Sequence, residues 1–329
     1  MMKKIKILAT GGTIAGKAAS STQLTGYTAG AYSVDDLLAS VPALGELAQI
    51  SGEQLCNIDS SSITDALLLR LAQRCNELLA QEDVDGVVIT HGTDTMEETA
   101  FFLNLTVKSD KPVVLVGAMR PATAVSADGP LNIINAVKTA VCAESAGQGV
   151  LVVMNDEIYG GRDVMKTNTA NVATFKAPNG GALGCIVGGE VRYYYRSVRP
   201  HTLAAEFAIS KVTALPRVDI IYAHIGQDRV LVDAACAAGA RGLVYAGSGM
   251  GSIHGAVEAA LAEAVQSGVV VVRSSRTGSG RVSAGLARWQ EQGFLYADNL
   301  NPQKARLLLQ LALLQTHERS EVQELLLRY

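Results

Sequence analysis

Short runs of apolar, mostly β-branched residues recur along this chain, and amphipathic stretches separate them. Runs of this kind are typical of strands that are buried on both faces of a parallel sheet. Alternation with helices places those helices on both sides of the sheet, so the sequence predicts an α/β fold. We expect strands at residues 5–9, 86–90, 113–116, 150–154, 219–222, 242–245 and 269–273.

The stretches between these runs carry helix signals. Residues 64–81 repeat apolar side chains with a helical period, which predicts an amphipathic helix that covers a sheet. Thr95 followed by Glu98 matches a capping box at the start of a second helix. Asn301 before Pro302 predicts an N-cap and a first-turn proline for a helix that continues to Leu314.

The length of 329 residues favours two domains. The alternation of strands and helices breaks between Ser197 and Pro216, a stretch with two prolines and no sustained period. We expect residues 1–196 to form a larger N-terminal catalytic α/β domain with a mostly parallel sheet flanked by helices. Residues 197–216 are expected to be the linker, and residues 217–329 a smaller C-terminal α/β domain.

Charge and hydropathy exclude several kinds of partner. The net charge is −3 and the isoelectric point is about 6.0, without a basic stripe that would neutralise phosphates, so we expect no nucleic-acid partner. No apolar run approaches the roughly 20 residues of a membrane span, so we expect no membrane partner. The apolar run before the first glycines is too short for a secretory signal. We therefore expect either a cytoplasmic protein or a chain from which a signal was removed.

Cysteine and histidine spacing gives no sign of a metal or a disulfide framework. The five cysteines are widely spaced and form no CxxC pair, so we expect free thiols in packed elements. The five histidines include no HExxH or other metal-ligand spacing, so we expect no metal.

Two glycine loops carry threonines directly after predicted strands: Thr13 in "ILATGGTIAG" and Thr93 in "VVITHGTDTMEET". Open α/β sheets bind small ligands beyond the carboxyl ends of their strands, where these hydroxyls and backbone N–H groups would lie. Simpler interpretations exist for each residue alone. The first loop can be a tight turn, Thr93 and Asp94 a helix entry, Lys166 a solvated surface lysine and Tyr27 an ordinary loop aromatic.

A nucleotide-binding interpretation fails on sequence detail. Gly11, Gly16 and Lys17 fit a phosphate loop, but Ala18 stands where the motif needs a Mg²⁺-binding hydroxyl. The stretch "GSGMGSIHG" from Gly247 does not satisfy the dinucleotide pattern G-x-G-x-x-G.

Six motifs occur in one order along the chain: "ATGGTIAG", "THGTDTMEETAFFL", "GAMRP", "SADGP", "NDEI…GRDVMKTNT" and "LNPQKAR". Together they resemble the bacterial L-asparaginase family, specifically its type II (periplasmic-type) branch, over nearly the whole chain. The resemblance implies hydrolysis of L-asparagine to L-aspartate and ammonia through a threonine acyl-enzyme, with L-glutamine as a slower substrate. It implies no cofactor and no metal.

The resemblance also assigns roles to individual residues. Thr13 matches the nucleophile, and Tyr27, in the loop that closes over the site, matches its activating partner. Thr93, Asp94 and Lys166 match a second cluster that helps to activate the nucleophile or the resolving water. The expected substrate-binding residues are Ser60, which matches the α-carboxylate contact, Ser61, Gly92, Thr93, Asp94, which holds the α-ammonium, and Ala118, a backbone contact to the amide.

Physical chemistry agrees with these roles. A threonine hydroxyl needs a nearby base, and a lysine can act as one only where burial favours its neutral amine, a shift that Asp94 would oppose. Backbone N–H groups of the two glycine loops are suited to stabilise a tetrahedral oxyanion.

The chain departs from the family pattern in several places. Met250 and Ser252 replace amide side chains, and the region around Gly285 holds no acid where the family projects a glutamate from the neighbouring subunit. Glu291 lies six residues later, and Ser61 stands where glutamine or glutamate is common. Losing a charge-assisted contact predicts weaker binding of the α-ammonium, with Asp94 as its main partner.

The resemblance further implies a homotetramer built from intimate dimers, with each active site completed between two subunits. The family's common disulfide is missing, since the matching positions fall near Gln81 and at Ser109. Alternative functions are a glutaminase-asparaginase of mixed specificity, the cytoplasmic regulatory type of asparaginase, and a noncatalytic amino-acid-binding module on the same fold.

Overall fold

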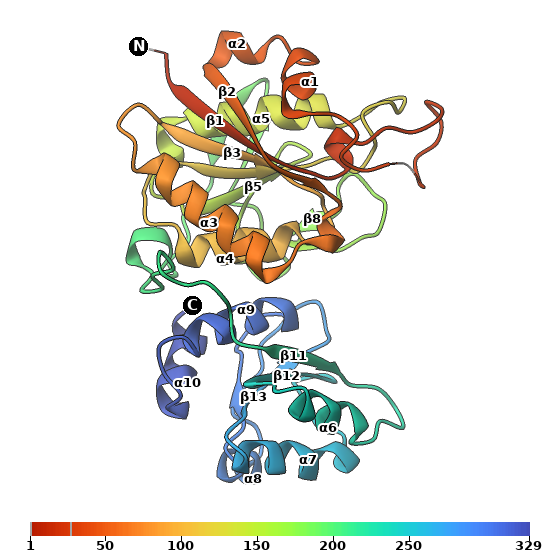
Figure 1. Ribbon diagram of the computed structural model, residues 1–329, viewed down its shortest axis with the longest axis vertical. Helices are drawn as coiled ribbons and strands as arrows, with labels where there is room; N and C mark the ends of the chain where they lie inside the picture. The colour runs from red at the N-terminus through yellow and green to blue at the C-terminus, as the bar shows by residue number, and fades with distance from the viewer. Residues whose placement is uncertain (1, 27) are drawn as a thin grey trace. The chain divides into compact units, whose positions relative to one another are not determined.

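A computed structural model describes residues 2–26 and 28–329. Contacts divide the chain into two compact units, Met1–Lys211 and Val212–Tyr329, each with its own sheet (Figure 1). The boundary lies inside the expected linker, 197–216. Much of that stretch packs, however, because Phe207 and Ile209 are buried. The expected domain limits stay a prediction.

The first unit is built on an eight-stranded sheet with the order β10-β9-β6-β5-β4-β3-β1-β2. The five strands from β5 to β2 pair in parallel, and β6, β9 and β10 are antiparallel. The strands of this sheet are β1 (Lys4–Gly11), β2 (Gln49–Ile58), β3 (Gly86–Thr90), β4 (Val113–Val116), β5 (Val150–Met154), β6 (Glu157–Gly160), β9 (Gly184–Val187) and β10 (Glu190–Tyr193).

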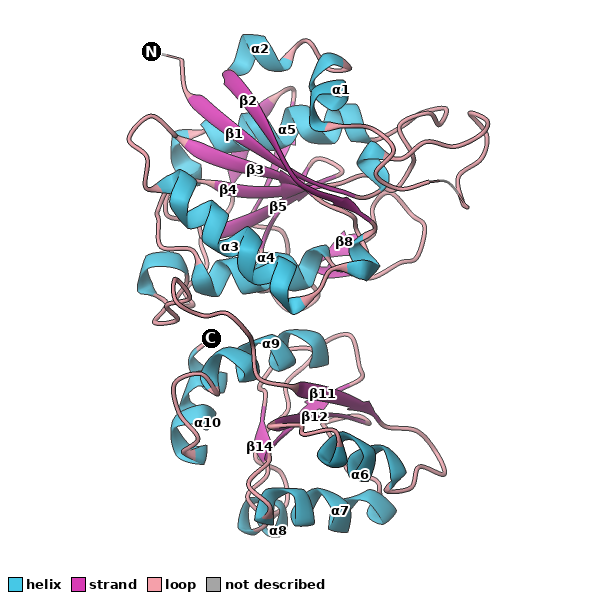
Figure 2. Cartoon of the chain, in the orientation of Figure 1, coloured by secondary structure: helices cyan, strands magenta, loops and turns pink. Residues whose placement is uncertain are grey.

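Helices cover both faces of this sheet (Figure 2). One face packs on α1 (Val34–Ala39), α2 (Leu44–Leu47) and α5 (Gly129–Val141). Strand residues such as Ile7 and Val114 form one hydrophobic core with the apolar side chains of these helices. The other face carries α3 (Asp65–Leu79) and α4 (Met96–Thr106). A separate two-stranded ribbon consists of β7 (Met165–Lys166) and β8 (Phe175–Lys176), and short 3-10 helices are η1 (Thr13–Ala15), η2 (Ser60–Ser62), η3 (Ala143–Ser145) and η4 (Thr202–Ala204).

The second unit is a smaller α/β layer structure. Its parallel sheet has the order β11-β12-β13-β14, with a core that includes Leu243, Val271 and Trp289. Its elements are β11 (Val218–Tyr222), α6 (Val230–Ala237), β12 (Gly242–Gly247), α7 (Gly255–Gln266), β13 (Val270–Ser275), α8 (Ala287–Glu291), β14 (Leu295–Tyr296), α9 (Pro302–Ala312) and α10 (Arg319–Arg328).

The predicted α/β class is confirmed, and each of the seven expected strands corresponds to an observed one. The Asn301 cap is also confirmed, since its side chain accepts a hydrogen bond from the Lys304 N–H, although α9 ends at Ala312 and not at Leu314. The capping box at Thr95 is wrong in its chemistry. Thr95 is the N-cap of α4, but its hydroxyl donates to the Ser60 carbonyl oxygen at 2.9 Å and caps no helical N–H.

The structure describes the state of all five cysteines and the length and polarity of its helices. All five cysteines are free thiols, as expected, and burial raises the pKa of Cys75 to about 12. In the part of the chain that the structure describes, no helix combines the length and apolar character that a bilayer crossing requires.

Candidate active site

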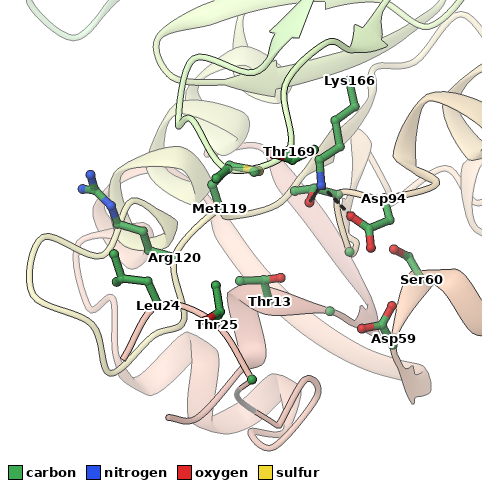
Figure 3. Close-up of a pocket in the computed structure, with 15 residues that line it drawn as sticks. Thr13, Leu24, Thr25, Asp59, Ser60, Asp94, Met119, Arg120, Lys166 and Thr169 are labelled. Carbon is green, nitrogen blue, oxygen red and sulfur yellow. Dashed lines mark hydrogen bonds and ion pairs between the residues drawn. The ribbon is translucent and has the colours of Figure 1, made fainter. Parts of the chain in front are cut away.

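A cavity of about 440 Å³ lies in the first unit, beyond the carboxyl ends of four adjacent parallel strands (Figure 3). Each of β4, β3, β1 and β2 continues into a loop that reaches it. This is the edge at which parallel sheets bind ligands. The cavity is lined by Gly12, Thr13, Leu24, Thr25, Gly26, Asp59, Ser60, Gly92, Thr93, Asp94, Met119, Arg120, Lys166, Thr169 and Ala170.

Glycine allows the two threonine loops to touch. A Cβ atom on Gly12 would lie 2.4 Å from backbone atoms of Gly92, and one on Gly92 would lie 2.6 Å from the Ser60 Oγ. Gly12 also has φ 80°, which L side chains rarely adopt. Only glycine at these two positions lets the loops after β1, β2 and β3 close around one cavity.

Thr13 begins the 3-10 helix η1, whose turn closes with a 2.8 Å bond from the Gly16 N–H to the Thr13 carbonyl oxygen. Its side chain is almost buried. Figure 3 shows the Thr13 hydroxyl pointing into the cavity, toward the side on which Ser60 and Asp59 lie. The hydroxyl is thus presented to a ligand rather than to bulk water.

Lys166 joins Thr93 and Asp94 in one polar cluster. Its Nζ donates to Thr93 Oγ1 at 2.9 Å and pairs with Asp94 Oδ1 at 2.5 Å. The Lys166 side chain is 16% exposed and that of Asp94 59%. Lys166 is therefore a partly buried member of the cavity wall, and the interpretation as a solvated surface lysine does not hold.

The backbone of Lys166 is held as well. Its N–H donates to Oε2 of Glu97 at 2.7 Å, and Glu97 is a buried residue in the first turn of α4. The segment from Thr93 to Glu97 therefore contacts both the backbone N–H and the side-chain Nζ of Lys166. Glu97 is absent from the sequence-based predictions, and the only signal is its place in the helix entry "TMEET".

His91 fixes the second glycine loop from inside. Its Nδ1 lies 2.6 Å from the Gly92 carbonyl oxygen, and its Nε2 lies 2.9 Å from Thr99 Oγ1. Burial lowers the pKa of His91 to about 4, so the ring is neutral at neutral pH. Since a carbonyl oxygen only accepts, Nδ1 carries the proton and Nε2 accepts from Thr99.

The two glycine loops differ in their N–H groups. The Gly12 N–H donates to the Ile58 carbonyl oxygen at 3.0 Å. Within the described ranges, by contrast, the Gly92 and Thr93 N–H groups donate to no protein acceptor, although Thr93 is buried. Buried N–H groups are normally paired, so two donors that line a cavity are available to a ligand oxygen.

Two of the expected substrate contacts do not line the cavity. Ser61 is exposed, and both its N–H and its hydroxyl donate to Asp59 Oδ1 at 2.9 Å. Ala118 is fully buried, and the next two residues, Met119 and Arg120, line the cavity instead. Ser60, Gly92, Thr93 and Asp94 all line it.

The segment that carries Tyr27 reaches the cavity through Leu24, Thr25 and Gly26. Its base is closed by paired backbone hydrogen bonds between Lys17 and Thr28. Tyr27 itself lies outside the described residues.

Asp59, which the sequence-based predictions omit, also lines the cavity. It follows β2 and is the N-cap of η2. The signal in the sequence is an acid directly before Ser60 in "NIDSSS". An aspartate before a serine-rich turn is usually a cap, so the local sequence does not mark Asp59 as a cavity residue.

The positions that match the family disulfide are joined by a lysine. Lys111 Nζ donates to the carbonyl oxygens of Leu79 at 2.9 Å and Gln81 at 2.7 Å, at the end of α3. The Lys111 N–H donates to Ser109 Oγ at 3.1 Å. A cation at a helix carboxyl end is favourable, so this contact fastens the same two segments without a covalent bond.

In the second unit, the positions that depart from the family pattern surround a buried arginine. Arg273 donates to the carbonyl oxygens of Gly251 at 3.2 Å and Ala284 at 2.7 Å, and its guanidinium lies 4.4 Å from the Trp289 ring centroid. Met250 and Glu291 are exposed. Among the described residues of the whole chain, no group of three or more His, Cys, Asp or Glu is placed to hold a metal ion.

Comparison with known proteins decides the family. Residues 4–199 match the model "Asparaginase, N-terminal", and residues 217–326 match the model "Glutaminase/Asparaginase C-terminal domain". The chain belongs to the asparaginase family.

Three relatives illustrate the range of this family. L-asparaginase 2 of Bacillus subtilis is 51% identical, over 98% of this chain and 85% of the relative. A glutaminase-asparaginase of Pseudomonas fluorescens is 43% identical, over 100% of this chain and 91% of the relative. The crystal structure of a probable cytoplasmic L-asparaginase from Campylobacter jejuni is 51% identical and covers 99% of this chain and 100% of its own, with a TM-score of 0.97.

Proposed function

We propose that this protein is an L-asparaginase that hydrolyses L-asparagine to L-aspartate and ammonia through an ester on Thr13, with L-glutamine as a slower substrate. The observation that carries the proposal is a single cavity shared by the Thr13 hydroxyl and the Thr93–Lys166–Asp94 cluster. The relatives named L-asparaginase support the choice of substrate.

In the first half-reaction, Thr13 Oγ attacks the side-chain amide carbon and loses its proton. The C–N bond breaks, and the nitrogen leaves as ammonia after it has gained that proton. Developing negative charge on the carbonyl oxygen is stabilised by N–H donors. The Gly92 and Thr93 N–H groups are suited to this role, because they donate to no acceptor among the residues that the structure describes. Removal of one such donor in other enzymes costs about 3 kcal/mol of transition-state stabilisation.

In the second half-reaction, water attacks the ester carbon, and the C–O bond to Thr13 breaks to release aspartate and the free hydroxyl. Because Lys166 Nζ donates to Thr93 Oγ1, the Thr93 hydroxyl keeps its own proton for donation elsewhere. Transfer of a proton from Thr13 or from the water to this cluster requires the reverse direction, in which Thr93 Oγ1 donates to Lys166 Nζ.

Replacement of Thr13 tests this proposal. We expect Thr13→Ala to abolish ammonia release from asparagine while L-aspartate still binds, and Thr13→Ser to retain measurable turnover because a hydroxyl remains. Undiminished ammonia release by Thr13→Ala would rule out Thr13 as the nucleophile. Wild-type protein that binds asparagine without turnover would instead favour a noncatalytic amino-acid-binding module.

A glutaminase-asparaginase of mixed specificity is the second candidate, supported by the Pseudomonas relative of that name. Steady-state ammonia assays with asparagine and glutamine separate the two. A kcat/KM ratio of about ten or more in favour of asparagine supports the first proposal, and a ratio near one supports the second.

We further propose a homotetramer of intimate dimers, in which a neighbouring subunit completes each site. Family membership is the support for this proposal. Activity that falls with dilution, in step with a loss of the tetramer in sedimentation, is the expected result, whereas a fully active monomer would exclude it.

A further inference from the structure

Asp59 is held in place by its neighbour. Its Oδ1 accepts both hydrogen bonds from Ser61, each 2.9 Å long. Among the described residues none donates to its Oδ2. One oxygen therefore orients the carboxylate, and the other remains for a ligand. Ser61 thereby positions this acid.

Four charged side chains line the cavity, and Asp59 differs from the other three. Lys166 and Asp94 pair with each other. The Arg120 guanidinium donates to the Ser126 carbonyl oxygen at 2.8 Å, and Figure 3 shows it directed away from the cavity. Asp59 pairs with no cation in the described part of the chain. Among the described residues, no cation neutralises the negative charge that Asp59 supplies to the cavity.

The position of this charge matches one end of an α-amino acid. Figure 3 shows the oxygens of Asp59, Ser60 and Asp94 at one end of the cavity, away from Leu24 and Arg120. The head of an amino acid has an ammonium and a carboxylate on one carbon, so it needs acceptors and a donor side by side. Two carboxylates with the Ser60 hydroxyl between them in the cavity wall meet that need.

We propose that Asp59 is a specificity-determining residue that binds the substrate's α-ammonium together with Asp94. The inference rests on the proposed function and names a recognition group of the same site. The region around Gly285 holds no acid, and Asp59 supplies a carboxylate from the same subunit instead. With this second carboxylate we no longer expect weak binding of the α-ammonium.

The test compares substrates with and without the ammonium. Succinamate is asparagine without its α-ammonium group. In Asp59→Asn we expect kcat/KM for asparagine to fall about ten- to a hundredfold, mainly through KM, because a neutral amide binds the cation more weakly. The value for succinamate should change by less than about twofold. Asp110→Asn is the matched control, since it removes an exposed carboxylate outside the cavity and should change neither value.

Asp59→Asn keeps the acceptor for Ser61, so the turn should fold, and a normal melting curve checks this. Equal losses for both substrates, or no loss for either, would overturn the role of Asp59. Binding separates this outcome from failure of the proposed function. Wild type should bind L-aspartate more tightly than succinate, and this preference should be smaller in Asp59→Asn, which keeps Asp94. A smaller preference in a protein that never releases ammonia would support the role of Asp59 and reject the proposed enzymatic activity.

Discussion

The two threonine loops look alike in the sequence, but the structure completes them differently. The loop after β1 is closed by backbone bonds: Gly12 donates to Ile58, and Thr13 starts a 3-10 turn. In the loop after β3, the Gly92 and Thr93 N–H groups donate to no acceptor in the described part of the chain. Side chains hold this loop instead, with His91 inside and Lys166 at the cavity. The loop after β1 directs the Thr13 hydroxyl into the cavity. The loop after β3 supplies the carboxylate of Asp94 and the N–H donors of Gly92 and Thr93 to the same cavity.

This difference suggests a division of labour, with the nucleophile on the first loop and its activation on the second. Each of the next three predictions alters one side of the comparison.

The largest effect should come from Lys166. We expect Lys166→Met to lower kcat about a thousandfold, because the variant keeps the length of the side chain but removes the group that exchanges protons with Thr93. Steady-state ammonia release at saturating asparagine measures it. A kcat within tenfold of wild type would show that the charged cluster is not the activating side.

The contact between the loops should matter next. Gly12→Ala would place a Cβ 2.4 Å from the Gly92 backbone at a φ of 80°, and we expect a loss of about 3 kcal/mol in the free energy of unfolding. Gly147→Ala is the matched control, with a φ of 69° and nothing within 4 Å of the new Cβ.

The control should lose only about 1 kcal/mol, the conformational cost alone. Urea unfolding of both variants measures the difference. Equal losses would mean that the loops are not held by close approach.

Per unit of pH, the effect at His91 is the smallest of the three. The pKa of His91 in the folded protein is about 4, below its ordinary value. Between these two values, the unfolded chain binds a proton on His91 and the folded protein does not. Stability from this group is fully present above pH of about 6.5 and is lost as the pH falls toward 4, by up to about 1.4 kcal/mol per unit.

Unfolding free energies of wild type and His91→Asn between pH 7 and 4 test this. In His91→Asn the unfolding free energy should fall less steeply as the pH decreases, because the asparagine amide does not titrate in this range. An unchanged slope would contradict the burial of a neutral imidazole.

Much of the fold could be predicted because its central strands are apolar throughout. Strands such as β3 and β5 are fully buried, and burial on both faces gives a continuous apolar run. The edge strand β2 has a mostly polar sequence, with Leu55 its only buried residue, so no such run marks it. The antiparallel strands β6, β9 and β10 are only four residues long each, which is too short for a clear period.

The site was predicted less completely, because its partners meet only in three dimensions. The two glycine loops could be found from local motifs. The contact of Lys166 with Glu97 spans 69 positions along the chain, and no local pattern reports it. Thr95 bonds to Ser60 on another loop instead of capping its own helix, so tertiary contact overrides the local signal.

The proposed ester on Thr13 is the central claim, and rapid acid quenching during turnover followed by peptide mass spectrometry tests it most directly. We expect the peptide that contains Thr13 to carry an aspartyl group, and Thr13→Ala to carry none. Steady ammonia release without that group on Thr13, or with it on Thr93, would contradict the assignment of the nucleophile to the first loop.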